Sequence, residues 1–179
     1  MDRGGKKRPV GAACVIRVCF HGAESTGKTT LVQRLGANLG CPIVPEYGRA
    51  YAETCGIDFG MPDLLAIAHE QDRLMHKAAL TRPKLLLLDT DPLMTAAWAE
   101  MLFGEVPGEL LAYPKADLYL LFAPDRPWVA DGTRFFGTSD ARARFAEIAE
   151  DVLVRTGVPY RTITGDWDER ERQVRAALS

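Results

Sequence analysis

The sequence predicts an α/β protein in which a five-stranded parallel sheet is covered by helices on both faces, giving three layers. Strand-like apolar segments alternate with segments of helical periodicity along the chain, which favours right-handed β-α-β connections. The run Leu85–Asp89 is apolar up to its last residue, as expected of a strand that is buried on both faces of such a sheet. A glycine-containing loop, Gly22–Thr30, joins the first predicted strand to the first predicted helix.

Short apolar runs predict the strands, and apolar residues three and four positions apart predict the helices. Gly40 and Gly157 end helices, whereas Pro62 suits the first turn of one. Asp166 and Glu169 have the spacing of a capping box, which opens the last helix. In chain order, the expected elements are a strand at about 15–20, a helix at 27–39, a strand at 42–45, a helix at 62–80, a strand at 85–89, helices at 92–102 and 107–113, a strand at 118–122, a helix at 139–156, a strand at 160–163 and a helix from 166.

Length and composition place the chain among ordinary globular proteins. Its 179 residues are 47% hydrophobic and 26% charged, and we expect a flexible tail at residues 1–13 followed by a single domain at 14–179. The formal net charge of −2 argues against a nucleic-acid partner, because no basic field attracts phosphates. The sequence has no apolar run of about 18 residues, so a membrane partner is not expected. The four cysteines lack metal-binding spacing, which favours reduced thiols and a cytoplasmic location.

The loop after the first strand has the spacing Gly-x-x-x-x-Gly-Lys-Thr of a phosphate-binding P-loop. Its glycines allow successive N–H groups to point at phosphate oxygens, and the following helix N-terminus adds partial positive charge. Lys28 is expected to reach the β- and γ-phosphates, and the Thr29 hydroxyl to bind Mg²⁺. The predicted cofactors are therefore ATP and Mg²⁺. The residues expected to bind the nucleotide are Gly22, Glu24, Ser25, Thr26, Gly27, Lys28, Thr29 and Thr30.

Two acids follow the buried strand of leucines. A hydrophobic strand that ends in an acid is the Walker B pattern, so Asp89 is expected to lie beside the P-loop and to hold the Mg²⁺ shell. Asp91 has two open roles. Its carboxylate would face the acceptor substrate and act in catalysis, or it would cap the following helix.

A third group of candidates lies at the end of the second predicted strand, before a connection that is expected to run without regular structure to about residue 60. In an open parallel sheet this end faces the ligand crevice. Glu46 is expected to orient or deprotonate an acceptor hydroxyl, and Tyr47 to stack on a flat ring. Arg49 is a substrate-binding candidate, although an ordinary surface ion pair between Arg49 and Glu46 is the alternative.

The segment at 124–138 is expected to be a long functional loop that acts as a lid. Arg134 would stabilise the charge of the transferring phosphate, and Trp128 would stack on a ligand ring. The other tryptophans, Trp98 and Trp167, are expected to be packing groups rather than binding groups.

Several motifs together identify a known family. The segments GAESTGKTT, PEYGRAY, LLLLDTDPLMTAAW, WVADGTRFFG and VPYRTITGD occur in this order, between about Val15 and the C-terminus. They resemble the ribosylnicotinamide kinase domain of bacterial NadR-type NAD-salvage proteins. The P-loop alone is shared by many families, whereas the EYGR, DTD and W-x-x-D-G-x-R elements together are much more specific.

The resemblance implies a nucleoside-kinase-like P-loop fold with the strand order 2-3-1-4-5. It also implies that Mg-ATP donates its γ-phosphoryl group to the 5′-hydroxyl of nicotinamide riboside, which gives nicotinamide mononucleotide. Lys28 and Thr29 match the phosphate and Mg²⁺ residues, and Asp89 matches the Walker B acid. Arg134 matches the lid arginine. Asp131 is the acid of the lid motif, and it would contact the substrate.

Two other functions compete with this interpretation. A kinase for another nucleoside or for a nucleotide would have the same core, and a nucleotide acceptor would need a cation such as Arg49 for its own phosphate. A regulatory P-loop ATPase switch belongs to a different class, because it needs no acceptor. A homo-oligomer is compatible with all three.

Overall fold

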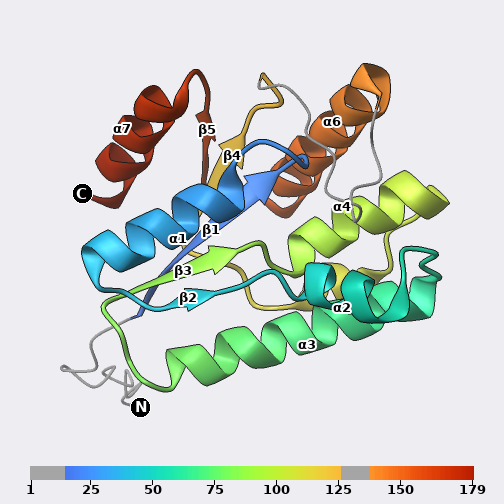
Figure 1. Cartoon of the computed structure of the whole chain (residues 1–179). Helices are drawn as coiled ribbons and strands as arrows, with labels where there is room; N and C mark the ends of the chain where they lie inside the picture. Colours follow the sequence, from blue (N-terminus) through green and yellow to red (C-terminus); the bar gives the residue numbers. More distant parts are fainter. Residues whose placement is uncertain (1–14, 126–137) are drawn as a thin grey trace, which may run out of the picture.

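A computed structural model describes residues 15–125 and 138–179 of the chain. It contains a five-stranded sheet in which every neighbouring pair of strands is parallel (Figure 1). The strand order is β2-β3-β1-β4-β5, which confirms the predicted order. The strands are β1 (Ile16–Gly22), β2 (Ile43–Val44), β3 (Leu85–Asp89), β4 (Leu118–Phe122) and β5 (Tyr160–Ile163).

Helices cover both faces of the sheet, so the predicted three layers are present (Figure 1). One face carries α1 (Lys28–Leu39) and α7 (Trp167–Leu178). The other face carries α3 (Met61–Ala79), α4 (Pro92–Phe103) and α6 (Ser139–Thr156), with α2 (Tyr47–Cys55) against α3 and α5 (Gly108–Ala112) against α4.

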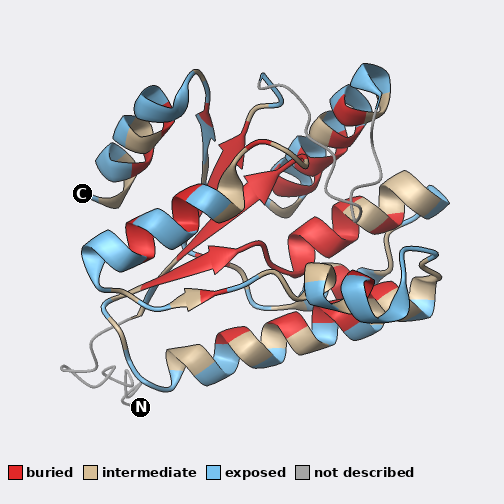
Figure 2. Ribbon diagram, in the orientation of Figure 1, coloured by how far each residue is buried: buried red, intermediate tan, exposed pale blue. Residues whose placement is uncertain are grey.

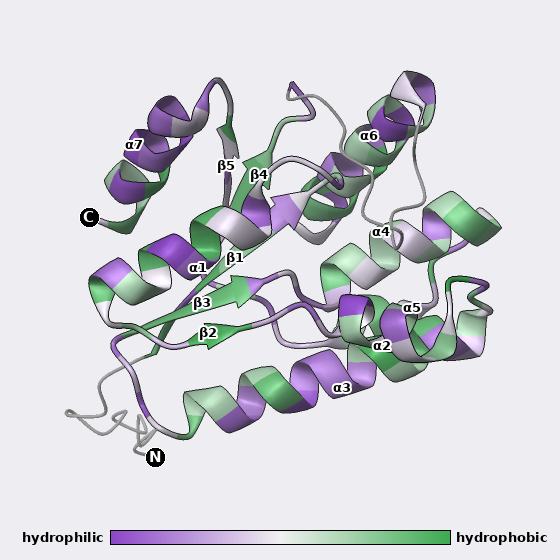
Figure 3. Cartoon of the chain, in the orientation of Figure 1, coloured by the Kyte–Doolittle hydropathy of each residue, from purple (hydrophilic) through white to green (hydrophobic). Residues whose placement is uncertain are grey.

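Alternating side chains of the central strand supply both halves of the core. Val18 and Phe20 pack against the α1 and α7 face, whereas Cys19 packs toward the opposite face. The central strands are buried along most of their length, and the helices are buried only on their inner sides (Figure 2). Hydropathy follows the same division, because β3 and β4 are hydrophobic and polar residues lie on the outer surfaces of helices such as α1 and α3 (Figure 3).

The expected connection after the second strand is wrong in part, because residues 47–55 form α2. The helix is only nine residues long and includes Gly48, so its local propensity is weak. Contacts with α3 stabilise it instead. The Tyr47 N–H donates to Oε1 of Gln71 at 2.8 Å, and the Tyr51 hydroxyl donates to Asp63 at 2.6 Å. Such long-range partners leave no periodic signal in a segment this short.

Helix termini agree with the predicted caps. Asp166 Oδ1 accepts a hydrogen bond from the N–H of Glu169, and Glu169 Oε2 accepts one from the N–H of Asp166, both at 2.9 Å. Thr138 caps α6 by accepting from the N–H of Ala141. In the described segments, 15–125 and 138–179, no helix is both long and apolar enough to cross a membrane.

A buried arginine of α7 ties together three segments that follow different strands. Arg170 is 1% exposed and donates to the carbonyl oxygens of Thr26, Ala123 and Gly165 at 2.8–3.1 Å. It also pairs with the carboxylate of Asp125. These acceptors belong to the P-loop and to the segments after β4 and β5. Arg170 therefore fixes the P-loop to the neighbouring strand ends.

We predict that Arg170→Met lowers the free energy of unfolding by about 3 kcal/mol, because it leaves buried carbonyls and a carboxylate without their donor. Urea denaturation followed by circular dichroism measures this change. Arg175→Met is the matched control in the same helix. Its guanidinium makes an exposed pair with Glu171, so the change there should stay within about 0.5 kcal/mol. Equal losses in the two variants would contradict the role assigned to Arg170.

Candidate active site

The P-loop backbone has positive φ angles at three residues, and glycine adopts such angles more easily than other residues do. Gly22 and Gly27 have φ angles of +119° and +88°, and Ser25 has φ +56°. A Cβ atom on Gly22 would lie 2.6 Å from the carbonyl oxygen of Phe122, so a larger residue does not fit there. Positive φ angles of this kind turn successive N–H groups toward one side, which creates a concave site for an anion.

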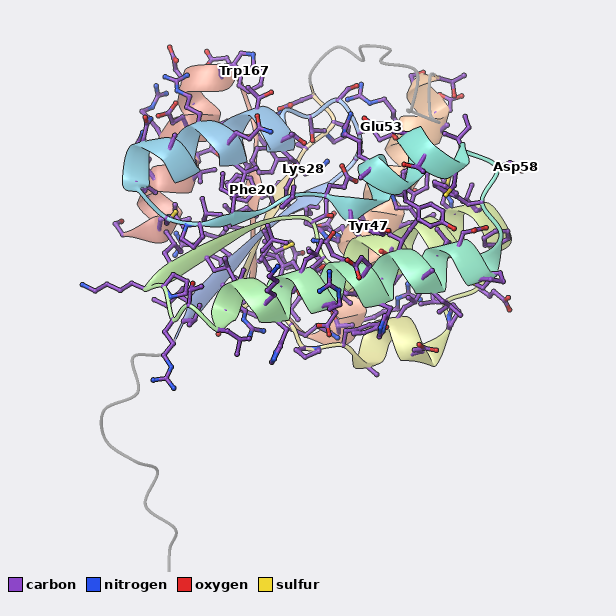
Figure 4. The ribbon with its side chains drawn as sticks, turned by 60° about the horizontal axis from the view of Figure 1, so that its bottom comes forward. Phe20, Lys28, Tyr47, Glu53, Asp58 and Trp167 are labelled. Carbon is purple, nitrogen blue, oxygen red and sulfur yellow. The ribbon has the colours of Figure 1, made fainter. Side chains whose placement is uncertain are left out.

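The ammonium group of Lys28 lies inside this loop. Its Nζ donates to the carbonyl oxygens of Gly22 and Ala23, both at 2.7 Å, and lies at the start of α1 (Figure 4). Burial lowers the pKa of Lys28, and the nearby carboxylates of Glu46 and Asp89 oppose that shift. The structure therefore places a partly desolvated cation at the mouth of the loop, where it suits a phosphate oxygen.

Asp89 and Thr29 form a pair that fits a magnesium ion. Asp89 is 2% exposed, and a hydrogen bond joins its carboxylate to the side chain of Thr29. Burial raises the pKa of Asp89, whereas the Thr29 bond and Lys28 lower it. Among the described residues, Oδ1 of Asp89 has no hydrogen-bond partner. A hydroxyl beside an unpartnered carboxylate oxygen is a donor set that Mg²⁺ accepts, so these two residues would hold the ion.

Two cavities meet at the carboxyl ends of the strands. The first follows the P-loop and contains about 870 Å³ of empty space, and the second lies between α2, α3 and α4 with about 600 Å³. We call them the P-loop cavity and the α2–α4 cavity. The residues that line both cavities are Glu24, Glu46, Arg49, Thr90, Met94 and Trp98.

Glu46 occupies the junction of the two cavities and precedes α2 as its N-cap residue. Burial raises its pKa to about 7, with a further increase from the charge of Asp89, whereas Lys28 and Arg49 act in the opposite direction. The guanidinium of Arg49 lies 3.8 Å from the Glu46 carboxylate. The ion pair that was the alternative to a site role is therefore present, and it lies within the site. A carboxylate with a pKa near neutrality is suited to accept a proton.

Three residues that the sequence did not place among the site candidates shape this junction. Gln71 is 2% exposed. It accepts from the Tyr47 N–H and donates to the Pro45 carbonyl at 3.2 Å, so it holds the backbone on both sides of Glu46. Thr90 has φ +78° and lines both cavities. A positive φ angle is rare for a β-branched residue and marks functional turns.

Trp98 is the third residue, and it has the packing role expected from the sequence. Its ring packs against that of Phe145 with centroids 4.9 Å apart, as a packing group would. The same ring also lines both cavities.

The remaining candidates are Tyr47 and three residues of the expected lid. Tyr47 packs edge-to-face against Tyr51, with ring centroids 6.2 Å apart, and does not line either cavity. The lid candidates Trp128, Asp131 and Arg134 lie outside the described residues, so their roles stay predictions.

The position of Asp91 favours the capping alternative over catalysis. The side chain is 1% exposed, and one oxygen accepts from the N–H of Leu93 at 3.0 Å to cap α4. The other accepts from the Tyr119 hydroxyl at 2.5 Å. Burial raises the pKa of Asp91 to about 6. Asp91 lines neither cavity, because the turn at Thr90 directs it beneath the site.

We predict that Asp91→Asn leaves turnover nearly unchanged, because the single amide oxygen of asparagine still caps α4, and the loss of the acceptor for the Tyr119 hydroxyl affects stability rather than the reaction. Asp91→Ala should lower the free energy of unfolding by about 1–3 kcal/mol, since it removes the cap and strands a buried hydroxyl. Steady-state kinetics and urea denaturation measure these effects. A loss of turnover of about 10²-fold or more in Asp91→Asn would instead identify Asp91 as a general base.

Comparisons with known proteins agree with this geometry. A family model described as "AAA domain" matches residues 17–170. The trifunctional NAD biosynthesis/regulator protein NadR of Escherichia coli (strain K12) is 30% identical over 166 residues, which cover 87% of this chain and 40% of that protein. The chain thus spans well under half the length of this curated relative.

Solved structures show the same fold. A crystal structure of NadR in complex with NR (nicotinamide riboside) has a TM-score of 0.74 at 24% identity and covers 91% of this chain and 50% of that one. A thymidylate kinase from Ehrlichia chaffeensis has a TM-score of 0.67 at 14% identity and covers 92% and 99%. The predicted resemblance to NadR is confirmed. The chain belongs to the AAA domain family, and it has the fold of the P-loop kinases.

Proposed function

We propose that this chain is a phosphotransferase that moves the γ-phosphoryl group of Mg-ATP to the 5′-hydroxyl of nicotinamide riboside, with nicotinamide mononucleotide as the product. The observation that carries the proposal is the position of Glu46, where the P-loop cavity meets the α2–α4 cavity. A hydroxyl that enters from the α2–α4 cavity would meet the carboxylate and the terminal phosphate at the same point. The relation to NadR supports the choice of acceptor.

Each residue at the junction has a defined task in this reaction. The P-loop N–H groups and Lys28 bind and orient the phosphates of the donor. Glu46 orients the acceptor hydroxyl and takes its proton as the new P–O bond forms. Thr29 and Asp89 would hold Mg²⁺, which neutralises phosphate charge when bound. Most of the rate enhancement then comes from positioning and charge neutralisation.

The α2–α4 cavity has the chemistry of a nucleoside site. Phe59, Ile67 and Trp98 supply apolar and aromatic surface, and Gln71 and Thr95 supply polar groups. The carboxylates of Glu24 and Glu46 also line it. Negative charge beside an aromatic ring favours a flat cation, and the pyridinium of nicotinamide riboside is such a group.

A nucleotide is the alternative acceptor. Arg49 lines both cavities and would pair with the phosphate of a nucleotide. Its 3.8 Å contact with Glu46 offsets part of that charge, which favours a nucleoside.

The decisive experiment incubates the protein with Mg-ATP and a panel that includes nicotinamide riboside, adenosine, thymidine and their 5′-monophosphates. We expect ADP and nicotinamide mononucleotide to appear in equal amounts, measured by liquid chromatography. ADP release that does not depend on any acceptor would support the ATPase switch instead. Turnover of another nucleoside or of a monophosphate, without turnover of nicotinamide riboside, would overturn the acceptor assignment. Lys28→Ala should abolish turnover in every case.

The raised pKa of Glu46 leads to a second prediction. A general base acts in its deprotonated form, so kcat/KM should rise with pH and level off above about 7. Glu46→Gln should lower kcat by about 10²-fold or more and remove this pH dependence. Glu53→Gln is the matched control, because Glu53 lies in α2, the helix that begins directly after Glu46, and is exposed. An unchanged pH profile in Glu46→Gln would show that another group titrates.

A further inference from the structure

Three buried side chains near the start of α4 each offer an atom that metal ions bind. Cys19 and His21 lie on β1, and Asp91 is the N-cap residue of α4. All three are at most 1% exposed, and their thiol, imidazole and carboxylate donor atoms lie within 4.8 Å of one another. Side chains two positions apart on a strand share a face, which places Cys19 beside His21. Asp91 follows the neighbouring strand β3, so spacing along the chain does not reveal the group.

The hydrogen bonding of His21 leaves one ring nitrogen with a free lone pair. Its Nε2 lies 3.0 Å from the carbonyl oxygen of Ala149, and a carbonyl only accepts, so Nε2 carries the proton. Burial lowers the pKa of His21 to about 3, so the ring is neutral. Its Nδ1 has no hydrogen-bond partner among the residues that the structure describes. Histidines that bind metals are oriented in the same way, with the second nitrogen donating to a carbonyl or carboxylate.

Hydrogen bonds also fix the direction of the Asp91 carboxylate. One oxygen accepts from the N–H of Leu93 at 3.0 Å, and the other accepts from the Tyr119 hydroxyl at 2.5 Å. That hydroxyl in turn accepts from the N–H of Ala116 at 3.1 Å. A carboxylate oxygen has two lone pairs, so Asp91 keeps a lone pair on each oxygen for a cation. Carboxylates that bind metals are usually held by such outer hydrogen bonds.

Donor type and charge favour zinc at this group. Sulfur, nitrogen and oxygen donors together suit Zn²⁺, whereas Mg²⁺ takes oxygen ligands. The thiolate of Cys19 and the carboxylate of Asp91 carry two negative charges, which a divalent cation cancels, so the filled site buries no net charge. Zinc forms bonds of about 2.0–2.3 Å, so the three donor atoms would move closer together by about an ångström.

We propose that Cys19, His21 and Asp91 bind a zinc ion that joins β1 to the start of α4. Zn²⁺ bonds to Sγ of Cys19, Nδ1 of His21 and a carboxylate oxygen of Asp91, and the thiol proton leaves to solvent on binding. His21 directly precedes Gly22 of the P-loop, and α4 carries Trp98 to the wall of both cavities. The ion therefore stabilises two walls of the active site without contacting a substrate. The inference goes beyond the proposed kinase reaction and does not depend on it.

The test uses Co²⁺ as a probe, because its absorption spectrum reports its ligands. The full chain is produced in minimal medium with Co²⁺ or Zn²⁺, so that the metal can enter the buried site as the chain folds. We expect equimolar metal by mass spectrometry, and a thiolate-to-cobalt charge-transfer band in the cobalt protein. The melting temperature of the zinc protein should exceed that of metal-free protein by about 5 °C or more.

Two variants locate the ion. Cys19→Ser should remove the charge-transfer band, and both Cys19→Ser and His21→Asn should lower the metal content by about tenfold or more, with circular dichroism to confirm folding. Cys55→Ser is the matched control, because Cys55 is an exposed cysteine outside the group and its loss should leave the band unchanged. Metal-free protein from both media would overturn the proposal and leave only a hydrogen-bonded polar cluster. A band that persists in Cys19→Ser would also overturn it, since another thiol would then hold the ion.

Discussion

The rest of the structure depends on the need to present several backbone N–H groups to a polyanion while the surrounding chain stays packed. Gly22 meets this need with φ +119° and with no side chain, because the Phe122 carbonyl would collide with a Cβ atom. Such a loop stabilises itself poorly, since its N–H groups point away from the core. Its stability therefore comes from outside, and Arg170 supplies it by binding the Thr26 carbonyl from α7.

The same requirement explains the charges at the carboxyl ends of the strands. Lys28 lies close enough to Asp89 and Glu46 to lower the pKa of both carboxyl groups, and both carboxylates in turn raise the pKa of Lys28. Burial disfavours all three charged forms, but a bound phosphate group and a cation would change that balance. The site therefore holds buried charges that ligands of opposite charge would stabilise on binding. This arrangement also keeps the pKa of Glu46 near neutrality, where a carboxylate can gain or lose a proton easily.

The sequence predicted most of the fold because its signals are local. Continuous apolar runs, as in Leu85–Asp89, and caps, as at Asp166, depend on neighbours in the chain. The parts that it missed depend on distant partners. Helix α2 needs Gln71, which lies 24 residues from Tyr47. The conformation of Thr90 and the shared position of Trp98 become visible only once β3, α4 and α6 are assembled. The site candidates on the P-loop were predictable from one motif, whereas the α2–α4 cavity was not.

The turn between Asp89 and Asp91 gives the two acids different positions, one beside the P-loop and one in the cap of α4. Two acids in one extended strand, two residues apart, would point to the same side of the sheet. The positive φ angle of Thr90 breaks that alternation. Asp89 stays beside Thr29, with one oxygen that has no partner within the described part of the chain, while Asp91 binds Leu93 and Tyr119. Because α4 starts from this cap, Trp98 and Met94 are carried to the wall between the two cavities. The acid that lines neither cavity thereby positions two residues that line both.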